Sequence, residues 1–573
     1  MYWQLNLMLF VCYIHCQDQP IIPTTCGTVQ GVYLQSRNGR TFSAFFGIPF
    51  AKPPIGELRF EPPQPVIDCP VFINASVEGP QCLQPNYNFP LINQEYVGSE
   101  DCLNLNIYTP NVTTDDLLPV MVYLYEGSWV LNGNSKQLHG PEYFMDEDIV
   151  LVVPNNRLHI FGYMSTEDYV VPGNMALKDQ VAALQYVQDN IKFFNGDPDR
   201  VTIFGESAGA STTNLHMRSS LSKGLFKQGI SQSGTASSAY SIIGVGTSLN
   251  FTKSIAARVN CDNADTQQLV NCLRTIDAEN LTKEHMNFLF SQPEARALFR
   301  PVIEQKDVPG AFLTKSSLLT TTSYRWMTGF TTKDIAYKYG GFAKQGIDKV
   351  LSLYDKNWDT VGPITLLLDD TSSDPVGVAE KVRKYYFQDD PITKEKRDEI
   401  TDMYTNFFVT NPMILDIRNN FGKTFVYQFD HLGEYTRAYG YGLPKNESFG
   451  SAVHEDDLIY LFPLNYVFPD LKFNDIDLNI SKLMVKLWVN FATYGNPTPE
   501  KISQDPQNPN DDKIKWTPFG FRSKYLLIET NKLSMKRDLL KDQYKFWTSL
   551  KVTDKLRSNF DSRGFLINKP PTK

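Results

Sequence analysis

The chain has 573 residues, of which 42% are hydrophobic and 21% are charged, a composition typical of a globular protein with a large core. Its formal net charge is −8 at pH 7, which makes nucleic acid and anionic membranes poor partners. These totals favour a globular protein that acts on something other than a polyanion.

The first predicted element is an apolar run at residues 5–14. It is too short to span a bilayer comfortably and is typical of a secretory signal peptide, which we place at residues 1–16. Residues 17–573 are predicted to form a single domain, because no Pro/Ser/Gly-rich linker separates a second one. Residues 558–573 are polar, so neither a transmembrane helix nor a lipid anchor is predicted at this end.

Cysteines and sequons both favour secretion. Two of the eight cysteines fall in the predicted signal peptide, and the remaining six are an even number, which favours disulfides over a metal site. The chain has no C-x-x-C pair and no cluster of His and Cys, so no metal is predicted. Sequons of the N-x-S/T type predict glycosylation at Asn74, Asn111, Asn250, Asn280, Asn446 and Asn479.

Strands alternate with helices along the first half of the chain. Residues 26–50 carry strand-like runs between glycine turns, which predict a small N-terminal β meander. Buried strands are predicted at residues 101–108, 119–125 and 149–153. A helix is predicted at residues 174–194, with Asn174 as its N-cap and Asn195 as a left-handed stop. The alternation predicts an α/β fold with a central, mostly parallel, twisted sheet flanked by helices, and a site at the C-terminal strand ends.

The most informative stretch is Gly205-Glu-Ser-Ala-Gly209, which fits the pattern G-x-S-x-G. A predicted strand at residues 201–204 precedes it and a small-residue helix start follows, which is the context of a nucleophile elbow. The turn is so sharp that a Cβ atom at position 205 or 209 would crowd it. Ser207 is therefore predicted to be a nucleophile, and the N–H of Ala208 to face the group that it attacks.

Several longer motifs occur together in one order. They are FGIPFAKPP at residues 46–54, SEDCLNLN at 99–106, GNMALKDQ at 173–180, NGDPDRVTIFGESAGAS at 195–211 and GSAVHEDDLIYLF at 450–462. This set resembles the carboxylesterase/cholinesterase family of α/β-hydrolases, in particular insect-type secreted carboxylesterases, from about residue 27 to about residue 548. The resemblance implies the α/β-hydrolase fold and a serine esterase that needs no cofactor.

The resemblance also implies a triad in the chain order Ser, acid, His. His454 lies in the family's histidine motif and is the expected base. The expected acid is Asp334, five residues after Gly329, where the family more often has Glu. The alternative for this residue is an exposed loop Asp beside Lys333. Five further histidines are expected to be structural or to lie on the surface: His139, His159, His216, His285 and His431.

The stretch Tyr125-Glu-Gly-Ser-Trp129 departs from the family, which has a run of glycines here. By position, the resemblance places the oxyanion donors at the N–H groups of Gly127, Ser128 and Ala208. We expect the side chain of Ser128 to narrow the site. We expect the charge of Glu126 to oppose a developing oxyanion unless the side chain turns away or pairs.

Other implications of the resemblance are structural. It pairs Cys82 with Cys102 and Cys261 with Cys272, and it leaves Cys26 and Cys69, which could pair with each other. It also implies two buried ion pairs, Arg59 with Glu100 and Arg157 with Asp179.

The predicted function is that of a secreted serine hydrolase that cleaves small carboxylic esters through an acyl-enzyme on Ser207. The alternative is a catalytically weak or inactive cholinesterase-like binding or adhesion protein, which the altered oxyanion stretch favours. Choline esters are not expected, because no Trp lies between Cys82 and Cys102 to stack on the choline group. The natural ester and the oligomeric state stay open.

Overall fold

The computed structural model describes residues 19–86, 95–110, 116–291, 298–443, 449–508 and 511–554. The predicted signal peptide at residues 1–16 and the sequon residues Asn111 and Asn446 lie outside this part of the chain.

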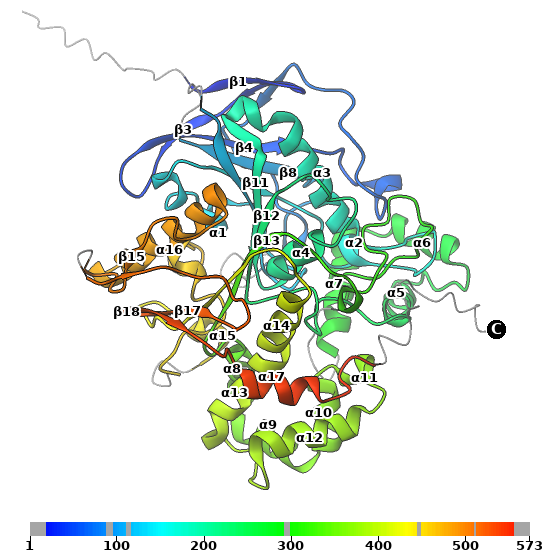
Figure 1. The fold of residues 1–573 in the computed structure, drawn as a ribbon. Helices are drawn as coiled ribbons and strands as arrows, with labels where there is room; N and C mark the ends of the chain where they lie inside the picture. The colour runs from blue at the N-terminus through cyan, green and yellow to red at the C-terminus, as the bar shows by residue number, and fades with distance from the viewer. Residues whose placement is uncertain are drawn as a thin grey trace, which may run out of the picture.

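An 11-stranded sheet forms the centre of the molecule, in the order β18-β17-β14-β13-β12-β11-β9-β10-β8-β4-β3 (Figure 1). Neighbours from β17 to β10 pair in parallel, and the outer strands pair antiparallel. The strands are β3 Val32–Gln35, β4 Thr41–Pro49, β8 Asn104–Thr109, β9 Leu118–Leu124, β10 Val150–Pro154, β11 Gly196–Glu206, β12 Gln228–Gln232, β13 Arg325–Thr331, β14 Thr424–Phe429, β17 Tyr525–Glu529 and β18 Lys532–Lys536. This confirms the predicted α/β fold with a mostly parallel sheet.

The small N-terminal β unit is present, but its strands come from different segments than a meander would use. It consists of β1 (Ile21–Thr24), β2 (Gly27–Gln30) and β5 (Phe72–Asn74), with β2 and β5 parallel. The runs that follow β2 become β3 and β4 of the large sheet instead. Two short hairpin-like pairs complete the strands: β6 Gln84–Pro85 with β7 Tyr96–Val97, and β15 Ile502–Ser503 with β16 Lys513–Ile514.

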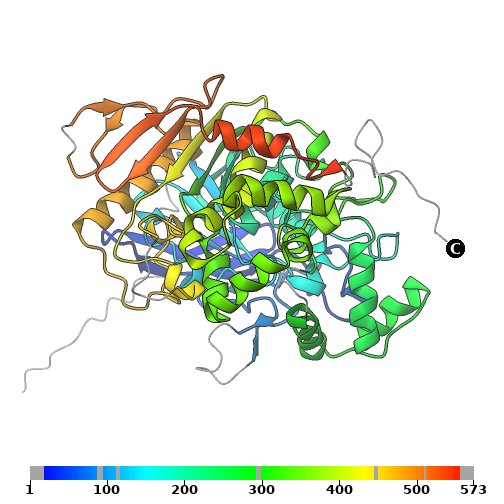
Figure 2. The same ribbon diagram turned by 90° about the horizontal axis from the view of Figure 1, so that it is seen from below.

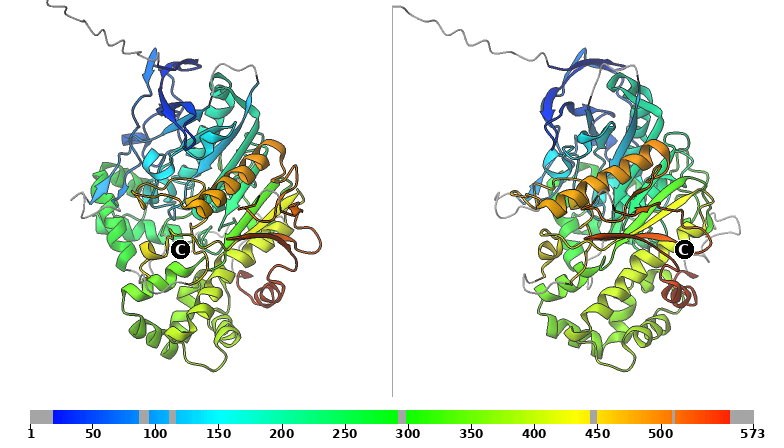
Figure 3. Two further views of the ribbon diagram at one scale, coloured as in Figure 1. Left: turned by 90° about the vertical axis from the view of Figure 1, so that its left-hand side faces the viewer. Right: turned by 60° about the vertical axis from the view of Figure 1, so that its left-hand side comes forward.

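Helices cover both faces of the large sheet. In Figure 1, α16 lies to the left of the sheet and α3 and α4 to its right, and Figure 3 shows α16 running along the sheet. The helices α8 to α13 gather at the end of the molecule opposite the N-terminal strands, and they lie in front of the sheet when it is seen from below (Figure 2). The helices are α1 Lys136–His139, α2 His159–Tyr163, α3 Met175–Asn190, α4 Ala208–His216, α5 Thr247–Arg258, α6 Thr266–Thr275, α7 Ala278–Ser291, α8 Ala336–Lys344, α9 Ile347–Lys356, α10 Trp358–Thr365, α11 Leu368–Thr371, α12 Pro375–Phe387, α13 Arg397–Thr405, α14 Asn411–Arg418, α15 Ala438–Tyr441, α16 Asp475–Tyr494 and α17 Lys541–Thr548.

The helix predicted at residues 174–194 is α3 followed by the 3-10 turn Ile191–Phe194. The expected N-cap is wrong: Asn174 has a φ of 60° and its side chain makes no capping hydrogen bond. Its amide instead donates to Oε2 of Glu304 at 2.7 Å, which joins the start of α3 to a distant segment. Asn195, with a φ of 64°, forms the left-handed stop that the sequence predicts.

Covalent and ionic links connect segments that are distant in the sequence. The structure contains the disulfides Cys26–Cys69, Cys82–Cys102 and Cys261–Cys272. Arg59 forms an ion pair with Glu100 at 2.6 Å and also donates to the carbonyl of Ile276 at 2.6 Å, just beyond α6. Arg157 and Asp179 form a buried pair at 2.7 Å. Arg59 lies between Cys26 and Cys69, and its partner Glu100 lies between Cys82 and Cys102. The contacts of Arg59 therefore fix both disulfide loops to the segment that follows α6.

The four sequon residues within the described segments differ in exposure. Asn74, Asn250 and Asn280 are exposed, whereas Asn479 is half-buried and its amide donates to Gln507 at 2.7 Å. No helix in the described part of the chain combines the length and the apolar character needed to cross a membrane.

The five histidines expected to be structural or superficial are all buried: His139, His159, His216, His285 and His431. Two of them stack on each other between α2 and α7, with the ring centroids of His159 and His285 5.3 Å apart. Neither nitrogen of His285, nor Nδ1 of His159, has a hydrogen-bond partner among the described residues. Burial lowers the pKa of His159 to about 4, and burial together with His159 lowers the pKa of His285 well below 6.5.

This stacked pair predicts a loss of stability in acid. Both rings bind a proton in the unfolded chain near pH 6.5 but stay neutral in the folded protein, so the free energy of unfolding should fall as the pH falls from 6.5 toward 4. The variant His285→Phe should flatten this pH dependence in urea unfolding. Phe299, whose ring lies 5.5 Å from that of His285, offers a matched control, since Phe299→Leu should lower stability equally at every pH. An unchanged pH slope in His285→Phe would contradict this account.

Candidate active site

Ser207 lies between the end of β11 and the start of α4, in the middle of the sheet. Its φ of 51° and ψ of −117° are strained for a non-glycine residue and point the hydroxyl out of the turn. A Cβ atom at Gly205 would lie 2.3 Å from the carbonyl oxygen of Leu124, and one at Gly209 only 1.9 Å from the same atom. The two glycines are therefore required by the close approach of the elbow to the end of β9.

The structure brings the three expected triad residues together. Oγ of Ser207 lies 2.9 Å from Nε2 of His454, and Nδ1 of His454 lies 2.6 Å from Oδ1 of Asp334. Asp334 follows β13, and His454 lies in the loop after β14, so the three side chains meet at the C-terminal ends of parallel strands. The N–H of His454 also donates to the carbonyl of Asp334 at 3.1 Å, which fixes the two loops to each other.

The alternative of an exposed Asp beside Lys333 does not hold, because Asp334 is fully buried. Its second oxygen, Oδ2, accepts hydrogen bonds from the hydroxyl of Ser233 at 2.7 Å and from the N–H of Thr331 at 3.0 Å. The carboxylate is thus oriented by three partners, of which His454 is one. Nothing in the sequence around Ser233 indicated this role, since the residue follows β12 outside any motif.

Several buried carboxyl groups surround His454, and they carry different charges. Burial lowers the pKa of His454, but Asp334 and its hydrogen bond outweigh this effect, and the pKa is raised above 6.5. Burial and the neighbouring carboxylates Glu455 and Asp457 raise the pKa of Glu206 well above its usual range. Burial raises the pKa of Asp457 to about 6. The site therefore disfavours a negative charge on Glu206, which sequence reasoning passed over inside the elbow motif.

One group in the described segments has the spacing of metal ligands: Glu206, His454 and Glu455, whose ligand atoms lie within 4.8 Å of one another. Both nitrogens of His454 already contact Ser207 and Asp334, and Glu455 forms an ion pair with Arg437 at 2.6 Å. These donors belong to the triad and its surroundings, which does not fit a metal site.

The loop after β9 lies next to the elbow and adopts left-handed backbone conformations at three successive residues. The φ angles are 105° at Gly127, 55° at Ser128 and 61° at Trp129. Within the described part of the chain, no acceptor takes the N–H groups of Gly127, Ser128 or Ala208. Ser128 is exposed, so its side chain lies on the open side of this loop. That these three N–H groups are the oxyanion donors stays a prediction, with which their lack of an acceptor is compatible.

The exception stated for Glu126 applies, because its side chain turns away and pairs. Its side chain is 2% exposed and turns into the core, where Oε1 lies 3.0 Å from Nε2 of His139. Burial alone would raise the pKa of Glu126, but His139 and Tyr123 lower it to about 2. The negative charge is thus paired and does not face the reaction.

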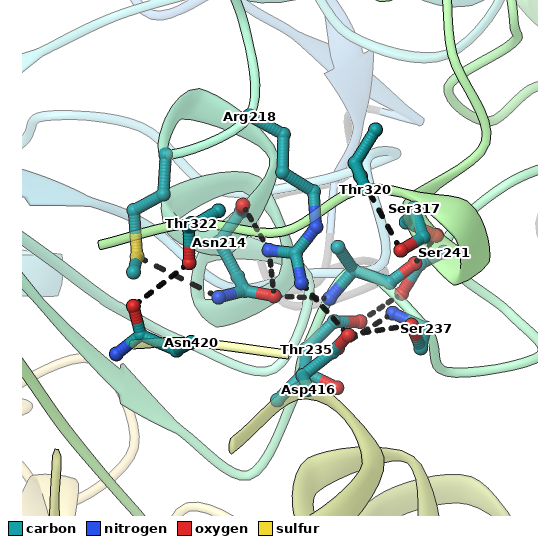
Figure 4. A network of polar contacts seen from close by, with 12 residues as sticks. Asn214, Arg218, Thr235, Ser237, Ser241, Ser317, Thr320, Thr322, Asp416 and Asn420 are labelled. Carbon is teal, nitrogen blue, oxygen red and sulfur yellow. Dashed lines mark hydrogen bonds and ion pairs between the residues drawn. The ribbon is translucent and has the colours of Figure 1, made fainter. Parts of the chain in front are cut away.

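A buried network holds the far end of the nucleophile's helix (Figure 4). Arg218, just beyond α4, binds Oδ1 of Asp416 on α14 at 2.8 Å, and both side chains are fully buried. Asp416 also accepts from the N–H and the hydroxyl of Ser237, at 2.9 and 2.6 Å. Asn214 on α4 accepts from Arg218 at 2.7 Å and from the N–H of Ala236 at 3.1 Å. The network joins α4, the segment after β12 and α14 into one unit.

The sequence profile of the Carboxylesterase family matches residues 18–547. Juvenile hormone esterase of Tribolium castaneum is 34% identical over 560 residues, which cover 92% of this chain and 93% of the relative. A carboxylic ester hydrolase of Bombus ignitus is 32% identical over 519 residues, which cover 87% and 90%. Among solved structures, juvenile hormone esterase from Manduca sexta, with OTFP covalently attached, superposes with a TM-score of 0.78 and 25% identity, covering 93% of this chain and 99% of that one.

The position of Ser128 predicts how acyl size affects turnover. A left-handed residue with an exposed side chain restricts the space before Ser207, so Ser128→Gly should raise turnover on esters with bulky acyl groups relative to short ones. Comparing kcat/KM across an acyl series measures this. A uniform change along the series would show that Ser128 does not limit acyl size. The double change Glu126→Gly with Ser128→Gly should instead lose activity, because it leaves the buried His139 without its carboxylate.

Proposed function

The chain belongs to the carboxylesterase family and is a carboxylic ester hydrolase, and on that premise we propose that it is a secreted serine esterase whose acyl-enzyme forms on Ser207. The observation that carries the proposal is the continuous chain of hydrogen bonds from Ser207 through His454 to Asp334, at 2.9 and 2.6 Å. Such a chain activates a hydroxyl that is otherwise a poor nucleophile near neutral pH.

In the first half of the reaction, Oγ of Ser207 attacks the ester carbonyl while its proton passes to Nε2 of His454. The carbonyl oxygen becomes an oxyanion, which accepts hydrogen bonds from the N–H groups of Gly127, Ser128 and Ala208. Asp334 keeps the other proton on Nδ1 and stabilises the imidazolium. The C–O bond to the alcohol then breaks, and His454 gives its proton to the leaving alcohol.

In the second half, water replaces the alcohol. His454 takes a proton from the water, the resulting hydroxide attacks the acyl carbonyl, and the same N–H groups bind the second oxyanion. The bond to Oγ breaks, Ser207 recovers its proton from His454, and the carboxylic acid leaves.

Three features support secretion. The chain begins with an apolar run at residues 5–14, carries sequons, and forms three disulfides, which persist in oxidising compartments. The names of two relatives make juvenile hormone the first ester to test in a substrate series that also contains short and long acyl esters.

Removing the hydroxyl tests the nucleophile. Ser207→Ala should abolish hydrolysis of an activated ester and covalent labelling by an organophosphate, while the melting temperature stays close to that of the wild type, because the fold does not depend on Oγ. The wild type should release a burst of alcohol equal to the enzyme concentration. Labelling that persists in Ser207→Ala would contradict the assignment of the nucleophile. A wild type that releases no burst would favour the alternative, a catalytically weak or inactive binding protein.

The raised pKa of His454 predicts the pH dependence of kcat/KM. Only the neutral imidazole can accept the serine proton, so activity should rise with pH through an ionisation above pH 6.5. Asp334→Asn removes the charge that raises this pKa and loses the tautomer control, so turnover should fall by about 10⁴-fold and the remaining activity should titrate at lower pH. Wild-type turnover in Asp334→Asn would mean that another carboxylate orients His454.

A further inference from the structure

Glu126 is the first residue of the oxyanion loop, which we define as residues 126–133, and both oxygens of its carboxylate are hydrogen-bonded. Oε1 accepts from Nδ2 of Asn132 at 3.0 Å, and Oε2 accepts from the hydroxyl of Tyr123 at 2.6 Å. Nε2 of His139 lies 3.0 Å from Oε1 and 3.2 Å from Oε2. Both oxygens of this buried carboxylate thus have hydrogen-bond partners, which offsets the free-energy cost of burying it.

Both ring nitrogens of His139 have a hydrogen-bond partner. Nδ1 lies 2.9 Å from the carbonyl oxygen of Gly133, and Nε2 faces the carboxylate of Glu126. The imidazole thus bridges the carboxylate of Glu126 and the carbonyl of Gly133, with one ring nitrogen directed at each.

These contacts close the oxyanion loop at its two ends. Glu126 is its first residue, and it binds Asn132, near the other end, directly. His139 connects Glu126 to Gly133, the last residue. Gln84 clamps the same end, since it donates to the carbonyl of Asn132 at 2.9 Å and accepts from its N–H at 2.8 Å. The residues between the closed ends include Gly127 and Ser128, which carry two of the three N–H groups proposed to bind the oxyanion.

The loop needs such a closure, because its backbone is strained. Ser128, Trp129 and Asn132 all have positive φ angles, of 55°, 61° and 82°, which are unfavourable for residues with a Cβ atom. The middle of the loop is fixed to the nucleophile's helix, where Nε1 of Trp129 donates to Oγ1 of Thr212 at 3.3 Å. The carbonyl of Trp129 also accepts from the N–H of His159 at 2.7 Å.

From this arrangement we infer that Glu126 and His139 are a positioning pair, which holds the N–H groups of Gly127 and Ser128 in the orientation that binds the oxyanion. The inference rests on the proposed function. Neither residue touches the substrate, and both act through the backbone of the loop. The pair supplies by buried hydrogen bonds the loop geometry that a run of glycines would reach by conformational freedom alone.

The transition state is where the pair should matter. Oxyanion donors bind the developing negative charge much more strongly than the neutral ground-state carbonyl, so their displacement lowers kcat more than it raises KM. Losing a donor entirely costs about 10²–10³-fold in turnover. A loop that has lost its closure still presents the donors part of the time, so a loss of roughly 10–100-fold is expected.

Two variants break the pair. Glu126→Ala removes the carboxylate, and His139→Phe keeps the aromatic contacts with Tyr123 and Phe462, at centroid distances of 4.8 and 5.5 Å, but removes both ring nitrogens. In each we expect kcat on an activated ester to fall roughly 10–100-fold with KM changed less than about threefold. Affinity for an aryl trifluoromethyl ketone, whose adduct with a serine places an oxyanion in the hole, should fall in parallel. The double variant should be no worse than the poorer single one.

Two controls separate positioning from general stability. Glu126→Gln keeps the shape and most of the hydrogen bonds, so its kcat should lie between those of the wild type and of Glu126→Ala. His431 and Asp477 form a second buried His–carboxylate pair, at 2.7 Å, between β14 and α16. His431→Phe should lower the melting temperature about as much as His139→Phe, with kcat and ketone affinity of the folded enzyme unchanged.

The results distinguish this inference from the proposed function. If the wild type hydrolyses esters through Ser207 but both Glu126→Ala and His139→Phe keep wild-type kcat and ketone affinity while losing stability, the pair is core packing and the inference is wrong. If one variant fails to fold, the other decides. Ester hydrolysis that survives in Ser207→Ala would overturn the proposed function itself.

Discussion

The carbonyl oxygen of Leu124 leaves no room for a side chain at either glycine of the elbow. A Cβ atom on Gly209 would lie 1.9 Å from this oxygen, and one on Gly205 would lie 2.3 Å from it. The backbone at the end of β9 therefore packs directly against the backbone at the end of β11 and the start of α4. This contact sets the distance between Ser207, at the end of β11, and the proposed N–H donors in the loop after β9. Every other feature of the site, from the strained φ of Ser207 to the closed oxyanion loop, is arranged around a separation that only two glycines permit.

Several buried acidic groups lie around the imidazole of His454, and burial makes a negative charge on each of them unfavourable. Within the described residues, the structure stabilises the charge of one of them with hydrogen bonds that another one lacks. Asp334 receives hydrogen bonds from Ser233 and Thr331 in addition to His454, so its negative charge is stabilised. Neither oxygen of Glu206 has a hydrogen-bond partner in the described part of the chain. Burial therefore raises the pKa of this carboxyl group. Nδ1 of His454 lies 2.6 Å from Oδ1 of Asp334 and 3.4 Å from Oε1 of Glu206, so Asp334 is the nearer acceptor for its proton.

What could be predicted from the sequence was local or tied to a motif. The elbow, the alternation of strands with helices and the histidine motif each depend on short stretches with a strong pattern, and the structure brings Ser207, Asp334 and His454 within hydrogen-bonding distance. Long-range polar partners carry no such pattern. Asn174 has the right residue type for a cap, yet it binds Glu304, 130 residues later. Ser233 likewise binds a distant partner, Asp334, which lies 101 residues later.

Glu126 shows the limit of reasoning by position. Its place in the chain left two outcomes open, a charge that opposes the oxyanion or a side chain that turns away and pairs. The direction of a side chain cannot be read from the sequence of a loop with positive φ angles. Its partner His139 lies 13 residues later and belongs to a short helix without a motif. A histidine and a carboxylate that pair in the core can be recognised only once the conformation of the loop is known.

The distance along the chain between Ser207 and His454 affects how the protein is made. The two side chains that form the hydrogen bond lie 247 residues apart, and β12, β13 and β14 are all laid down between them. A ribosome therefore exposes the serine long before it synthesises the histidine. No nascent fragment that ends before residue 454 holds a base for the nucleophile, so on this assignment the growing chain stays chemically inert until the sheet is almost complete.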